Sequence, residues 1–81
     1  MFTIRDVPGR MPVAELRRYF EKAIGDTPSL KANTPLGAVE INGKFSHYFD
    51  ADTDTMWLGF AIGMRAAQKI AASQAAEERK S

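Results

Sequence analysis

The chain has 81 residues, of which 44% are hydrophobic and 26% charged, with a net charge of +1 and no cysteine. This composition is that of a small globular domain and not of a disordered chain, and the lack of cysteine excludes disulfides, thiolate nucleophiles and thiolate-rich zinc sites. A chain of this size buries only about 60 to 65% of the surface that it exposes when unfolded, so its core is thin and self-association would help to stabilise it.

Charge is divided unevenly along the chain. Residues 1–36 carry a net charge of +2, residues 37–64 carry −3 and residues 65–81 carry +2. This separation is too mild for a nucleic-acid-binding arm, which needs clustered Lys and Arg and a domain pI above about 9. It favours complementary faces on neighbouring copies or on partner proteins.

The strongest hydrophobic signal is a run of nine apolar or glycine residues from Met56 to Met64. A bilayer-spanning helix needs about 20 such residues, and Arg65 ends this run too early. Residues 1–30 mix charged and apolar side chains, unlike a secretory signal. We therefore expect no membrane contact and a cytoplasmic location.

The chain begins with a short predicted strand. Residues 2–5 alternate apolar and polar side chains, which places Phe2 and Ile4 on the inner side. Pro8-Gly9 then marks a turn. We expect the strand to pair with a hairpin formed later in the chain, or a second copy to supply a strand instead, because a lone hairpin is marginally stable in water.

Residues 12–24 have the pattern of an amphipathic helix. Pro12 is tolerated in the first turn, and Gly25 follows the last apolar position as a capping glycine does. The apolar face holds Val13, Leu16, Phe20, Ala23 and Ile24. Two prolines among Thr, Ser and Asn predict a loop over residues 26–35, and loops of this length are often functional.

A basic edge on this helix is a candidate partner-binding surface. Its cations are Arg17, Arg18 and Lys22, and Lys31 adds another in the following loop. We expect this edge and residues 27–34 to face a target protein. Two other interpretations stay open: an ordinary solvated face, because glutamates lie among the cations, or phosphate contacts in a nucleic-acid-binding or regulatory protein.

Asn42-Gly43 between two β-prone runs predicts a hairpin with strands at residues 37–41 and 44–49. Both turn residues tolerate the positive φ of a type I′ turn. A two-residue loop pairs Ile41 with Lys44, Glu40 with Phe45, Val39 with Ser46 and Ala38 with His47. Each face of the predicted hairpin is then mixed in polarity.

Three aspartates at alternate positions, Asp50, Asp52 and Asp54, precede the last predicted helix. Hard divalent cations take such carboxylates, but the segment lacks the glycine and the final glutamate of a calcium loop. We therefore interpret Asp52 or Thr53 as the helix cap and expect no metal site.

Residues 53–78 form the last predicted helix, and we expect residues 74–81 to be a solvated, fraying end. Gly59 and Gly63 share one face, and each costs the helix about 1 kcal/mol relative to Ala, which makes sense where something packs closely against that face. We favour packing within the chain over contact with another subunit. The candidate residues for helix packing or for a dimer interface are Trp57, Gly59, Phe60, Gly63, Met64 and Ala67.

Catalytic and cofactor-binding motifs are absent from the sequence. His47 is the only histidine, and the four serines lie in no nucleophile-elbow context. The glycines lack the strand-loop-helix setting of a phosphate loop. An enzyme would require the aspartates of residues 50–54 to hold a metal. We expect instead a non-enzymatic protein without a cofactor.

One part of the chain resembles a known group of proteins. The residues that carry the resemblance are Gly43, Phe45, Tyr48, Asp50, Thr53, Trp57, Gly59 and the pair Ala66-Ala67. This succession is similar to the C-terminal part of small uncharacterised proteins of tailed bacteriophages and prophages, which often carry a second Trp where Phe60 stands here. The resemblance implies a phage accessory protein. Such proteins include inhibitors of host or defence machinery, anti-CRISPR proteins among them.

Together these patterns predict one α+β domain over residues 1–81. Its elements are a helix at 12–24, a short antiparallel sheet with strands at 2–5, 37–41 and 44–49, and a long helix at 53–78. The expected function is protein-protein binding, as a homodimer through the long helix, with a protein or complex of a bacterial host as the target.

Overall fold

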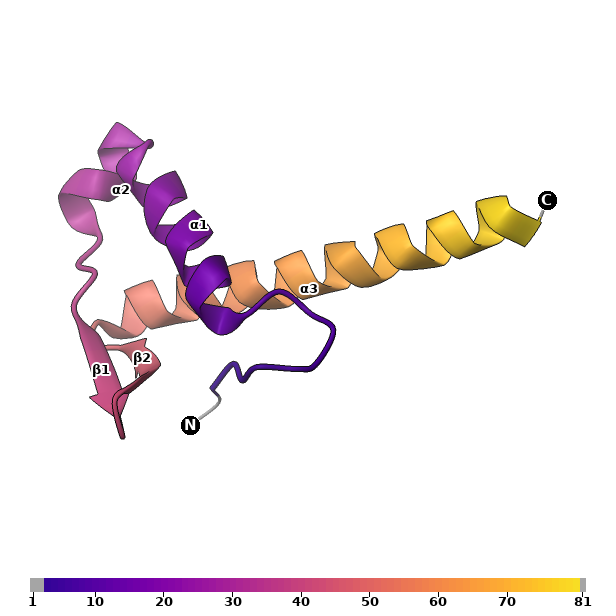
Figure 1. Ribbon diagram of the computed structural model, residues 1–81. Helices are drawn as coiled ribbons and strands as arrows, with labels where there is room; N and C mark the ends of the chain where they lie inside the picture. The colour runs from indigo at the N-terminus through magenta and orange to yellow at the C-terminus, as the bar shows by residue number, and fades with distance from the viewer. Residues whose placement is uncertain (1–2, 81) are drawn as a thin grey trace.

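The computed structural model describes the backbone of residues 3–80 and the side chains of residues 3–77. Its elements confirm the α+β class: α1 (Val13–Gly25), α2 (Pro28–Asn33), β1 (Ala38–Ile41), β2 (Lys44–Tyr48) and α3 (Ala51–Lys80). In Figure 1, α1 and the hairpin lie along the first half of α3, and the second half projects alone. We call residues 3–65 the head and residues 66–80 the projecting half of α3.

The head is held together by an apolar core around Trp57, which is fully buried. One face of α1 packs onto this side chain, with the ring centroids of Phe20 and Trp57 5.7 Å apart. From the hairpin, the ring centroid of Phe45 lies 5.6 Å from that of Trp57. The buried core residues are Ile4, Val13, Leu16, Phe20, Ile24, Tyr48, Trp57 and Ala61. The expectation that neighbours cover the tryptophan is confirmed, and these neighbours belong to the same chain.

The predicted first helix is confirmed as α1, but the predicted strand at residues 2–5 is wrong. Its described residues follow an irregular path, and Phe2 lies outside the described part of the chain. Ile4 is nevertheless buried, and Asp6 Oδ1 accepts a hydrogen bond of 2.8 Å from the backbone N of Val13. Core packing and the cap of α1 therefore fix this segment without a strand partner.

A second difference is α2, which occupies most of the predicted loop at residues 26–35. Pro28 stands in the first turn, where its fixed φ suits a helix and its missing N–H is not needed. The carbonyl of Thr27 accepts hydrogen bonds from the backbone N of Leu30 and Lys31, at 3.0 and 2.9 Å. None of the six residues of α2 is buried. Local hydrogen bonds therefore form this helix, and its sequence has no apolar periodicity from which it could be predicted.

The hairpin is confirmed, but its register changes part-way along the strands. Both turn residues have positive φ, 56° and 76°, as a type I′ loop requires. Beyond the first two pairs, Val39 pairs with His47 instead of Ser46, and Ala38 pairs with Tyr48 instead of His47. The cause is a bulge, which adds one residue to β2. This extra residue directs Tyr48 into the core, where it is buried.

The long helix is confirmed as α3, but its cap is Asp50 and not Asp52 or Thr53, because the helix begins earlier than predicted. Asp50 Oδ1 accepts hydrogen bonds from the backbone N and the hydroxyl of Thr53, at 2.9 and 3.2 Å. The backbone N of Tyr48 donates to Asp54 Oδ1 at 3.0 Å. Asp50 therefore caps α3, and Asp54 joins the hairpin to the first turn of this helix.

Candidate protein-binding surface

The described residues contain no group of three or more His, Cys, Asp or Glu side chains that could hold a metal ion. Asp50 and Asp54 make the hydrogen bonds given above, and Asp52 is exposed. His47 Nδ1 lies 2.9 Å from the hydroxyl of Ser46. Within the same described part, no helix has both the length and the apolar character needed to cross a membrane.

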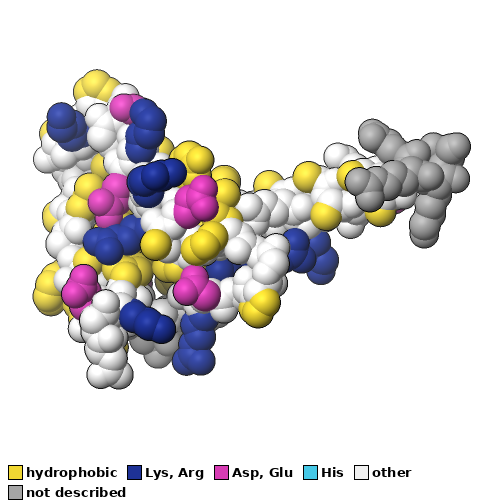
Figure 2. Space-filling view, in the orientation of Figure 1, with side chains coloured by type: hydrophobic (Ala, Val, Ile, Leu, Met, Phe, Trp, Pro, Cys, Tyr) yellow, Lys and Arg dark blue, Asp and Glu magenta, His cyan; other side chains and the backbone are white. Residues whose placement is uncertain are grey.

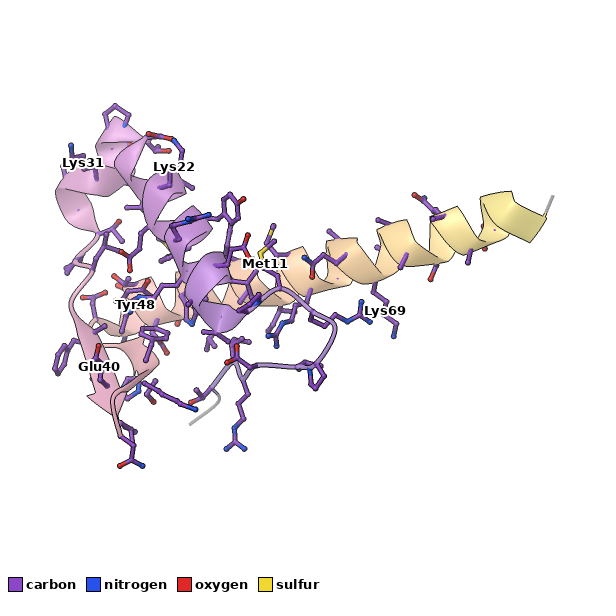
Figure 3. The ribbon with its side chains drawn as sticks, in the orientation of Figure 1. Met11, Lys22, Lys31, Glu40, Tyr48 and Lys69 are labelled. Atoms are coloured by element: carbon purple, nitrogen blue, oxygen red, sulfur yellow. The ribbon has the colours of Figure 1, made fainter. Side chains whose placement is uncertain are left out.

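The basic edge predicted on the first helix does not form one patch. Arg17 Nε donates to Glu21 Oε2 at 2.8 Å, and the Arg17 guanidinium lies 4.3 Å from the ring centroid of Phe45. Arg17 is thus engaged within the head. Lys22 Nζ lies 2.9 Å from Asp26 Oδ2. Figure 3 labels Lys22 and the exposed Lys31 where the end of α1 meets α2.

Arg18 is the fourth member of the predicted edge. It is exposed on α1, and its guanidinium lies 5.7 Å from the ring centroid of Tyr19, which is 42% exposed. Arg18 and Lys31 are therefore the two cations of the predicted set for which the structure records no carboxylate partner among the described residues. Their role in partner binding stays a prediction.

A partly buried network of hydrogen bonds links the hairpin to α1. The Tyr48 hydroxyl donates a hydrogen bond of 2.8 Å to Glu21 Oε2, the same oxygen that accepts from Arg17. Burial, and then the hydrogen bond to Glu21, raise the pKa of the Tyr48 phenol above its ordinary value of 10.0. The sequence could not reveal this network, because Tyr48 and Glu21 are 27 positions apart and the bulge decides where Tyr48 points.

This network predicts a loss of stability at alkaline pH. The fold favours the neutral phenol of Tyr48, so its contribution is complete below the ordinary pKa of 10.0 and is lost as the pH rises from there towards the raised value. Urea unfolding between about pH 8 and 11 should show this decline. In Tyr48→Phe the free energy of unfolding should be lower by about 1 kcal/mol near neutral pH and the alkaline decline should be smaller. An equal decline in both proteins would contradict the assignment.

A cleft of about 690 Å³ opens between the N-terminal segment, the start of α1 and the hairpin. Its walls include the cations Arg5, Arg17 and Lys44 and the carboxylates of Asp6 and Glu40. These charges nearly balance, so the cleft selects neither an anionic nor a cationic ligand by charge.

The predicted helix-packing residues of α3 divide between two sides of the helix. Trp57 is buried, and Phe60 and Met64 are partly buried against the core. Ala67 is exposed. A Cβ added to Gly59 or Gly63 would meet nothing within 4 Å among the described residues. The expectation that the glycine face packs within the chain is therefore wrong, because the core lies on the opposite side of α3.

This exposed side of α3 is an uncharged apolar row. We call this side the outer face. Its residues follow one another at alternating spacings of three and four positions, and Ile62 lies beside them. They are Met56, Gly59, Gly63, Ala66, Ile70 and Ser73. The side chains of Met56, Ile62 and Ile70 are 37%, 51% and 58% exposed. In Figure 2 the projecting half of α3 shows mostly hydrophobic and neutral side chains, and Figure 3 labels Lys69 at its lower side. Residues 71–77 are all exposed.

Comparison with protein-family models, curated proteins and solved structures finds no match for this chain. The surfaces described above therefore rest on the geometry of this structure. Of these surfaces the outer face is the longest and the least polar.

Proposed function

We propose that this chain is a non-enzymatic protein-binding module whose main contact surface is the outer face of α3. The observation that carries the proposal is the exposure of Met56, Ile62 and Ile70 along one uncharged side of a helix that leaves the head. Contiguous exposed apolar surface marks sites of interaction with other proteins. A helical segment without tertiary contacts is also marginally stable in water, so a bound partner would stabilise the projecting half.

The biological role that we propose is that of a phage-type accessory protein in the cytoplasm of a bacterial host. It would occupy a surface on a host protein or defence complex and so inhibit it, as anti-CRISPR proteins do. Support comes from the resemblance over Gly43 to Ala67. Its aromatic residues Phe45, Tyr48 and Trp57 pack together in the head, so these three of the similar residues belong to one packing unit.

Affinity capture tests this function. The tagged chain, Ile70→Glu and the control Ala75→Glu would each be incubated with bacterial lysate, and retained proteins identified by mass spectrometry. Ile70 lies on the outer face, whereas Ala75 is an exposed residue on the other side of the same helix. We expect a retained protein with the unaltered chain and with Ala75→Glu, and at least a tenfold loss, about 1.4 kcal/mol, with Ile70→Glu. Equal retention by all three would contradict the proposal.

The same samples test the nucleic-acid alternative. Phosphate contacts by Arg18 and Lys31 would make binding to generic duplex DNA fall steeply as salt is added. We expect no salt-dependent binding to DNA, because Lys22 and Arg17 are already paired with carboxylates. Steep salt dependence that disappears in Arg18→Ala would favour the alternative.

A further inference from the structure

We infer that the outer face is covered by a second copy of this chain, with the two α3 helices antiparallel and the two-fold axis between Gly63 and Ala66. This inference rests on the proposed function, since it names a second copy as a partner that binds the same face, and a host protein would bind there in competition with that copy. A two-fold axis requires the face to be complementary to itself. The residues of the outer face meet this requirement in size and in position along the helix.

Size complementarity follows from the spacing of large and small residues. In the antiparallel pair, Ile70 lies opposite Gly59 of the partner subunit, and Met56 lies opposite Ser73 of the partner subunit. Each large side chain of the row thus meets a small one, and Gly63 meets the partner's Ala66 at the centre. Such alternation lets two helices approach closely and fill the space between them. A parallel pair would place Ile70 against the partner's Ile70 and glycine against glycine, which leaves gaps.

The centre of the outer face carries no charge. No residue of the face is charged between Asp52 and Glu77, so this centre can lose water without leaving a charge unpaired, and Lys69 lies at its edge. Charge does not select the direction of the pair, because the antiparallel register places Asp52 opposite the partner's Glu77 at each end.

The head does not block this pairing. α1 and the hairpin pack against the side of α3 that carries the fully buried Trp57 and Ala61, which is opposite the outer face. The overlap of two α3 helices would be about 40 Å long, and a contact width of about 10 Å gives a footprint of roughly 400 Å² on each subunit. This is about half of a standard interface of ~800 Å² per partner. We therefore expect a dimer that dissociates on dilution.

Disulfide trapping between two single-cysteine variants tests the direction of the pair, and the natural chain contains no cysteine to interfere. Met56→Cys and Ser73→Cys, carrying different tags, would be mixed and oxidised. The antiparallel dimer should give the mixed disulfide and neither homodimer, because two copies of position 56 lie about 25 Å apart along the helix pair. Ala75→Cys, on the other side of α3, is the matched control and should cross-link with neither. Efficient self-cross-linking of both variants would overturn the antiparallel assignment.

Sedimentation equilibrium of the unaltered chain, Ile70→Glu and Ala75→Glu tests self-association itself. We expect a concentration-dependent dimer for the unaltered chain and for Ala75→Glu, and a dissociation constant at least about tenfold higher for Ile70→Glu. If the unaltered chain is monomeric while Ile70→Glu still loses the captured host protein, the second copy is excluded and the proposed function stands. If it is monomeric and capture is unaffected, both fail.

Discussion

Trp57→Ala is expected to leave the head unfolded at room temperature. Its indole is fully buried and lies within 5.7 Å, between ring centroids, of both Phe20 and Phe45. Truncation of such a side chain costs about 3 to 5 kcal/mol. A single core in a chain of this size supplies a net stability of only about 3 to 5 kcal/mol. Far-ultraviolet circular dichroism should therefore show a large loss of helix, and urea unfolding should lack a cooperative transition.

Met56→Ala is the matched control on the same helix. Met56 is 37% exposed on the outer face, so its truncation should leave the stability of the head within about 1 kcal/mol of the unaltered chain. In the unaltered chain, the fluorescence of the sole tryptophan should resist quenching by aqueous iodide. A cooperative transition of unchanged midpoint in Trp57→Ala, or an indole that iodide quenches freely, would contradict the central place given to this residue in the core.

The elements that could be predicted are those whose cause is local. The apolar spacing of residues 12–24 and the turn residues Asn42-Gly43 act over a few positions, and α1 and the hairpin follow them closely. The buried state of Trp57 follows from its size and apolar character. The prediction of a strand at residues 2–5 is wrong. Alternation of apolar and polar residues over four positions indicates which side chains point inward, but it does not indicate whether the backbone pairs with another strand.

The remaining features depend on contacts between distant parts of the chain. The bulge in β2 directs Tyr48 towards Glu21 on α1, and only the folded head brings these residues together. Arg17 illustrates the same limit for a candidate site residue, since the sequence shows its charge but not the ring of Phe45 beneath its guanidinium. The spacing of four residues between Arg17 and Glu21 is visible in the sequence, but the contact of this pair with Phe45 and Tyr48 is not.

The outer face shows what the sequence can and cannot say about a binding surface. The helical spacing places Gly59 and Gly63 on one side of α3, and this is confirmed by their shared exposure. Which neighbour lies against that side depends on where α1 and the hairpin pack, and both pack on the side of Trp57. The helix therefore carries two apolar sides, one covered by the head and one available to another molecule.

Gly63→Leu should stabilise the head slightly and weaken self-association, so its two effects should have opposite signs. A side chain at this exposed helical position meets nothing within 4 Å among the described residues. Replacing glycine there gains up to about 1 kcal/mol of helix propensity, which should raise the melting temperature of the dilute monomer. In the dimer the same side chain would lie where the two helices are nearest to each other. Overpacking there costs about 1 to 3 kcal/mol of the free energy of association.

Thermal unfolding at low concentration and sedimentation equilibrium at high concentration measure these two effects separately. We expect the dissociation constant of the dimer to rise between about fivefold and a hundredfold in Gly63→Leu. Ala75→Leu is the matched control, because it adds a similar side chain to an exposed position on the other side of α3 and should leave self-association unchanged. A Gly63→Leu dimer as tight as the unaltered one would show that the helices do not meet at this glycine. A fall in monomer stability would mean that the head itself packs there.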